Sequence, residues 1–110
     1  MKITFRDKRL RGLIENNRKL LKEFGLVRSK KLILRLTQLE DAMNLEEVRY
    51  LPGNYHELQH NRKGQWSCDL DQPYRLVFTP MEDPIPANEN GQFIWIEITG
   101  VEILEIIDYH

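Results

Sequence analysis

The 110-residue chain has a single cysteine, and it has no apolar run near the roughly 18 residues that a membrane span requires. Cys68 has no second cysteine to pair with, so an internal disulfide is excluded, and a lone thiol suits a reducing compartment. The N-terminal segment MKITFRDKRLRG lacks the apolar stretch of a signal peptide. We therefore expect a cytoplasmic protein without a membrane segment.

Several motifs that define enzyme classes are also missing. The chain has no glycine-rich phosphate loop, nucleophile elbow, cysteine pair or His-x-x-x-His on a helix. His56 and His60 are four residues apart, but they lie in a segment of strands and turns, where this spacing does not place both on one helix face. Only Asp108 or His110 could add a third metal ligand. The sequence thus predicts neither a metal site nor a cofactor.

Charge is unevenly distributed along the chain, although the net charge is only −1. Residues 1–35 contain 12 Lys and Arg against 3 Asp and Glu, whereas residues 36–110 contain 4 against 14. Such asymmetry indicates either an anionic partner (RNA, DNA or an acidic protein) or simply a pair of solvated basic helices.

Hydrophobic spacing predicts one domain over residues 1–110, beginning with a short strand at Met1–Phe5. A helix capped by Asp7 should run to about Phe24 and end at Gly25. A second helix capped by Ser29 should continue to about Met43 and form an antiparallel hairpin with the first. The apolar residues that should face the core are Leu10, Leu13, Ile14, Leu20, Leu21, Phe24, Leu32, Leu36, Leu39 and Met43.

Beyond Asn44 the pattern favours strands separated by turns. The predicted strands are Tyr55–His60, Gln65–Leu70, Tyr74–Thr79, Phe93–Ile98 and a central Val101–Ile107. The proline-rich stretch Pro80–Gly91 is a predicted surface loop. The fold class is therefore α+β, with an N-terminal strand and a two-helix hairpin packed on a curved, mainly antiparallel sheet.

The residues able to do chemistry form a metal-free set that suits RNA cleavage. An enzyme that cleaves RNA takes a proton from the 2′-hydroxyl, stabilises charge on phosphorus and protonates the leaving 5′-oxygen. Histidine suits the proton transfers, and arginine or lysine suits the phosphate. Aromatic rings provide stacking surfaces for bases. The candidates are His56, His60, Arg62, Lys63, Trp66, Tyr74, Arg75, Asp108, Tyr109 and His110.

Each candidate has a structural alternative. His56 could be structural, and Trp66 could belong to the core rather than stack on a base. Arg75 could pair with Asp69 or Asp71, and the Tyr109–His110 end could be frayed. Residue types and spacing leave both interpretations open.

A set of short motifs resembles the HigB-like killer toxins, a branch of the RelE/ParE toxin superfamily of toxin–antitoxin systems. The resemblance covers nearly the whole chain, and its motifs are specific in combination. They are Leu51-Pro52-Gly53, His56-Glu57-Leu58, Asn61-Arg62-Lys63-Gly64-Gln65-Trp66-Ser67, Tyr74-Arg75-Leu76-Val77-Phe78 and the terminal Asp108-Tyr109-His110.

This resemblance implies a RelE-like fold and ribosome-dependent, metal-free cleavage of mRNA in the ribosomal 30S A site. It implies neutralisation by a HigA-type helix-turn-helix antitoxin. By motif, His56 matches a catalytic histidine, Arg75 a phosphate-stabilising arginine, and Asp108, Tyr109 and His110 the terminal triplet. The expected RNA-binding residues are His60, Arg62, Lys63, Trp66 and Tyr74.

The sequence departs from the family pattern in two places. Gln59-His60 replaces the family's Lys-Gly after the first histidine, which removes a cation near the phosphate, and the segment Pro80–Gly91 is longer than in compact members. Two alternative functions remain open: a ParE-like toxin that targets gyrase by protein contact, and a catalytically inactive module that binds RNA or an antitoxin.

Overall fold

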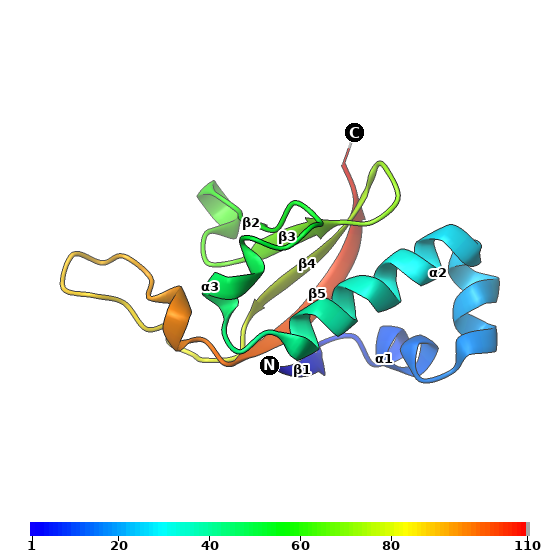
Figure 1. The fold of residues 1–110 in the computed structure, drawn as a ribbon, viewed down its shortest axis with the longest axis horizontal. Coiled ribbons are helices and arrows are strands. Elements are labelled where there is room, and N and C mark those ends of the chain that lie inside the picture. Colours follow the sequence, from blue (N-terminus) through cyan, green and yellow to red (C-terminus); the bar gives the residue numbers. More distant parts are fainter. Residues whose placement is uncertain (110) are drawn as a thin grey trace.

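The structure is a computed structural model that describes residues 1–109 (Figure 1). Within that range the chain forms a five-stranded open sheet in the order β1-β5-β4-β3-β2, together with α-helices and short 3-10 helices. The elements are β1 (Lys2–Phe5), α1 (Lys8–Ile14), α2 (Asn17–Asp41), α3 (Leu45–Val48), β2 (His56–Glu57), η1 (His60–Arg62), β3 (Trp66–Asp69), β4 (Tyr74–Pro80), η2 (Trp95–Glu97) and β5 (Gly100–Asp108).

The predicted α+β class is confirmed, and the sheet is mainly antiparallel. Strands β2, β3, β4 and β5 pair antiparallel in turn, while β1 pairs parallel to β5. Strand β5 therefore lies between β1 and β4, as its apolar sequence predicts. The 81–94 segment projects away from the sheet in yellow and orange in Figure 1.

The N-terminal helices differ from the prediction at their boundaries. Asp7 caps α1 as expected, since its carboxylate accepts hydrogen bonds from the backbone N–H groups of Arg9 and Leu10. However, α1 ends at Ile14, and Asn16 caps a new helix by accepting from Lys19 N–H. The break was missed because Asn16 lies inside a helical apolar pattern.

Gly25 interrupts α2, with φ +80° and ψ 173°, so the expected break falls at the expected residue. The loop of four or five residues expected after Gly25 does not form, because α2 resumes directly after the glycine. Ser29, the expected cap of the second helix, lies inside α2. The Ser29 hydroxyl is buried and donates to the carbonyl of Leu20, 3.2 Å away, which ties together the two segments of α2.

The core lies between α2 and one face of the sheet. Most of the predicted helix residues are buried there, but Met43 is 79% exposed and was wrongly assigned to the core. From the helices come Leu10, Leu13, Leu20, Leu32, Leu36 and Leu39, and from the strands come Trp66, Cys68, Leu76, Phe78, Val101 and Ile103.

Two predicted strands are largely replaced by other structure. The Tyr55–His60 strand shortens to β2, and the Phe93–Ile98 strand is instead the 3-10 helix η2, with Phe93 forming an isolated bridge to Ala87. Helix α3 was not predicted, although Asn44 and Glu47 form the reciprocal capping box that marks its start.

Candidate functional site

The sheet has a face turned away from the core, which we call the open face. Residues paired across antiparallel strands point to the same side. His56 pairs with Ser67, Ser67 with Val77, and Val77 with Glu105, so these four form one row across β2, β3, β4 and β5. The row lies on the side of the sheet away from the main core cluster, which contains the neighbouring residues Cys68 and Leu76. Ser67 and Val77 in the row are nevertheless completely buried.

His56 stands at the edge of this row with both ring nitrogens near polar atoms. Its Nδ1 lies 2.8 Å from the carbonyl oxygen of Asn54, which can only accept, so Nδ1 carries the proton in the neutral ring. Nε2 is then the acceptor nitrogen, and the Ser67 hydroxyl can donate to it across 3.5 Å. This tautomer presents Nε2 as a proton acceptor on the open face.

Arg75 lies on the next row of the open face, between Asp69 on β3 and Ile107 on β5. Its Nε is 3.4 Å from Oδ1 of Asp69, which confirms one alternative from the sequence. Both atoms are buried, and the pair is not aligned as a hydrogen bond. The charge of Arg75 is therefore balanced, while its hydrogen-bonding capacity is not fully used by Asp69.

The C-terminal segment meets β4, so the two chemically rich stretches of the sequence come together. Tyr109 N–H donates to the carbonyl of Pro73 at 2.9 Å, and the Arg75 guanidinium carbon is 4.5 Å from the Tyr109 ring centroid. Tyr109 therefore joins Arg75 on the open face. His110, the remaining acid/base candidate, lies outside the described residues.

Tyr74 and Asp108 pair with each other and lie on the opposite, helix-covered face, in register with Leu76. The guanidinium of Arg28 on α2 stacks 3.5 Å from the Tyr74 ring centroid. Arg28 also binds both carboxylate oxygens of Asp71, at 3.0 and 3.3 Å. Asp108 and Tyr109 thus point to different sides of the sheet, and of these two residues it is Tyr109 that shares the open face with His56.

Trp66 is corrected from a base-stacking residue to a core residue. Its side chain is completely buried, with Trp95 packed edge-on at 5.4 Å between ring centroids and the Arg49 guanidinium 4.8 Å from its ring. A base cannot reach either ring face. The alternative weighed from the sequence, a core tryptophan, is the structure observed.

The three polar candidates around η1 diverge. Arg62 reaches over the sheet, donating to Gln65 at 2.9 Å and approaching Glu105 on β5 at 3.4 Å. The Lys63 ammonium instead lies 5.8 Å from the Phe93 ring centroid, beside the 81–94 segment. His60 is exposed with φ +58°. Only Arg62 of this group belongs to the open face.

Positive charge is concentrated on the helices and is balanced on the open face. Arg75, Arg62 and Arg6 each form an ion pair, with Asp69, Glu105 and Glu102 respectively. Most cations of α1 and α2 are exposed, apart from the buried Arg35 and the partly buried Arg28, although Arg9 and Arg11 pair with Glu23 and Glu15. The exposed helical cations are Lys8, Arg9, Arg11, Arg18, Lys19, Lys22, Lys30 and Lys31.

Ser67 and Glu105 are residues of the open face that the sequence reasoning missed. Ser67 follows directly from pairing the strands on either side of Asn61–Gly64, so its position opposite His56 was available from the register. The position of Glu105 could not be predicted in this way, because a bulge between Val77 and Phe78 shifts the pairing of β4 with β5. Within residues 1–109 no cluster of three His, Cys, Asp or Glu could hold a metal, and no helix could cross a membrane.

Two of the solved structures that match this chain illustrate the shared fold. A chain of the YoeB-YefM complex from Staphylococcus aureus matches with a TM-score of 0.57 at 18% identity, covering all of this chain and 97% of the other. The YoeB/ParE toxin from Agrobacterium tumefaciens matches with a TM-score of 0.50 at 10% identity, covering both chains completely. No family model and no curated protein sequence matches. The chain therefore shares the fold of these proteins.

Proposed function

We propose that this protein is the toxin of a type II toxin–antitoxin system and that it cleaves mRNA on the ribosome. One observation carries the proposal: His56, Arg75 and Tyr109 share the open face, and the C-terminal segment is held against β4 beside Arg75. The RelE-like fold supports the class, and the sequence motifs favour the HigB-like branch.

The open face can divide the chemistry of RNA cleavage among its residues. In this proposal His56 Nε2 takes the proton of the 2′-hydroxyl, and Arg75 binds the phosphate as negative charge develops; the tautomer of His56 and the unused N–H groups of Arg75 support these roles. The Cα atoms of His56 and Arg75 should lie about 12 Å apart, because β2 is two strands away from β4 and Arg75 is two residues along β4 from the residue in line with His56. Two long side chains can close on a phosphodiester and its ribose across such a gap. His110, the other acid/base candidate from the motifs, is proposed to protonate the leaving oxygen.

The charge distribution accounts for dependence on the ribosome. Because the cations of the open face are paired with carboxylates, free RNA gains little from binding there. The exposed cations of α1 and α2 provide a separate surface that would bind ribosomal RNA. The ribosome would then bring the message to a face that binds it weakly in solution.

An antitoxin partner is part of the proposal. The YoeB-YefM neighbour is itself a complex, and in this chain α2 exposes Leu26, Val27, Ile33 and Leu34 beside Lys30 and Lys31. An apolar helix face with a basic rim fits an acidic amphipathic segment. We propose a HigA-type helix-turn-helix antitoxin in this role, as the motifs imply.

Arg75→Ala tests the site. Loss of the phosphate ligand should reduce mRNA cleavage at least about 100-fold and relieve growth arrest on induction. Primer extension on cellular mRNA measures cleavage, and a thermal melt checks the fold. Arg75→Lys, which keeps the charge beside Asp69 but not the planar fork, should retain partial activity.

The proposal is wrong if Arg75→Ala and His56→Ala both remain fully toxic. Intact message accompanied by DNA damage after induction would indicate gyrase as the target instead. RNA binding without cleavage, even with ribosomes present, would indicate a catalytically inactive module.

A further inference from the structure

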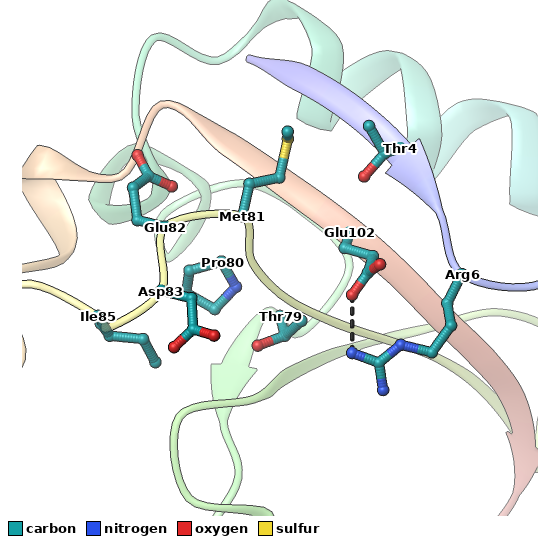
Figure 2. Close-up of a pocket in the computed structure, with 9 residues that line it drawn as sticks. All are labelled: Thr4, Arg6, Thr79, Pro80, Met81, Glu82, Asp83, Ile85 and Glu102. Atoms are coloured by element: carbon teal, nitrogen blue, oxygen red, sulfur yellow. Dashed lines mark hydrogen bonds and ion pairs between the residues drawn. The ribbon is translucent and has the colours of Figure 1, made fainter.

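A second feature of the open face is a pocket of about 380 Å³ where β1, β4 and β5 meet the 81–85 segment. Thr4, Glu102 and Thr79 pair across these strands, so the pocket continues the face that carries Arg75 and His56. Figure 2 shows Arg6 and Glu102 on one side, Asp83 on the other, and Thr79 between them.

The charges in the pocket select an uncharged ligand with N–H donors. Glu102 and Asp83 face the space with one cation, Arg6, which donates to Glu102 at 2.8 Å. Glu82 points away in Figure 2, and its carboxylate accepts from the backbone N–H and hydroxyl of Thr99. Because carboxylates outnumber cations, a phosphate is repelled, whereas a neutral group that donates hydrogen bonds is favoured.

We infer that this pocket binds a guanine base of the RNA, and the inference rests on the proposed function. Guanine is the RNA base whose Watson–Crick edge presents two adjacent donors, N1–H and the N2 amino group, which a carboxylate can accept together. The remaining N–H groups of Arg6, which is largely exposed, can donate to guanine O6 or N7. Pro80, Met81 and Ile85 supply an apolar wall for the ring.

The position of the pocket fits a subsite on the same RNA strand. Thr79 lies four residues from Arg75 along β4, which is about 13 Å. That distance is on the order of two nucleotides of an unstacked strand. The pocket would therefore set a preference for guanine about two nucleotides from the scissile phosphate.

Binding of two uncleavable pentanucleotides tests the pocket directly. The probes are UUGUU and UUAUU with every 2′-hydroxyl methylated, and fluorescence anisotropy measures their dissociation constants. The wild-type protein should bind the guanine probe about tenfold more tightly, the discrimination expected of a bidentate base contact. Glu102→Gln and Asp83→Asn should each bring the ratio toward one, while Glu97→Gln, an exposed carboxylate outside the pocket, should keep it.

A wild-type ratio near one overturns the inference, and so does a ratio that survives both pocket variants. The outcome is separable from the proposed function. Arg75→Ala should abolish cleavage yet keep the guanine preference in binding. Cleavage of mRNA without any guanine preference would contradict the role of the pocket and support the proposed nuclease. Guanine-selective binding without cleavage would support the pocket and contradict the nuclease.

Discussion

Strands β3 and β4 carry two faces that differ in charge, although their residues alternate along the same short segments. The helix-covered face presents Trp66, Cys68, Leu76 and Phe78, all completely buried. The open face presents Ser67 and Val77, which are also completely buried, and the half-buried Asp69 and Arg75, whose charges are matched. One step along a strand thus separates an apolar layer from a layer that holds the ion pair of Asp69 and Arg75.

Removing the largest core side chain should have the largest effect on stability. Trp66→Ala deletes a buried indole that contacts Trp95 and Arg49, so the free energy of unfolding should fall by about 3–5 kcal/mol. Urea unfolding followed by far-UV circular dichroism measures it. Tyr109→Ala, an aromatic deletion on the open face, should change stability by less than about 1 kcal/mol. Similar losses for both variants would contradict the division between the faces.

Alkaline pH should weaken the helix-covered face through two buried acids. Burial raises the pKa of the Cys68 thiol from 9.0 to about 12, and burial together with the neighbouring Cys68 also raises the pKa of Tyr55. Above pH 9 the unfolded chain releases these protons while the folded chain keeps them, so stability should fall between pH 9 and 12.

The slope should approach about 1.4 kcal/mol per pH unit for each group once its unfolded form ionises. Urea midpoints measured from pH 8 to 10.5 would show the decline, and Cys68→Ala should flatten it. A flat profile in the wild-type protein would contradict burial of these groups.

Loss of the cation that ties α2 to the β3–β4 turn should have an intermediate effect. Arg28→Ala removes a two-point contact with Asp71 and the stacking on Tyr74, so stability should fall by about 1–2 kcal/mol. Chemical unfolding measures the loss. Arg28→Lys, which keeps the charge without the planar stack, should lose less, and equal losses would assign the effect to charge alone.

Substitution of Glu105 on the open face should have the smallest effect on stability, and its main effect should be on RNA binding. Glu105→Gln frees Arg62 from an exposed ion pair, so stability should change by less than about 0.5 kcal/mol. RNA affinity should rise several-fold, with a steeper dependence on salt because Arg62 becomes available to a phosphate. Filter binding across a salt series measures both, with Glu40→Gln on α2 as the control. Unchanged affinity would show that Glu105 does not compete with RNA.

Part of the open face could be predicted because the pairing of neighbouring strands follows from the turns between them. Strand pairing across Asp71-Gln72-Pro73 places Asp69 opposite Arg75, so their ion pair was foreseen as an alternative. The strand expected at Phe93–Ile98 does not form, because its β-forming residues pack as η2 on α3 and Trp66 instead. The prediction that Met43 is a core residue was wrong because α2 ends at Asp41 and the chain then turns into the capping box of α3.

The sequence by itself determined the fold class, the capping of α1 by Asp7, the break at Gly25 and the central place of β5, because each depends on local conformation or on apolar periodicity. Only the tertiary structure decided which side of the sheet each polar residue occupies. A single residue of register, or one bulge between Val77 and Phe78, moves a side chain from one face to the other. For this reason Trp66 and Tyr74 lie on the helix-covered face, although both were predicted to bind RNA, whereas Ser67 and Glu105 lie on the open face.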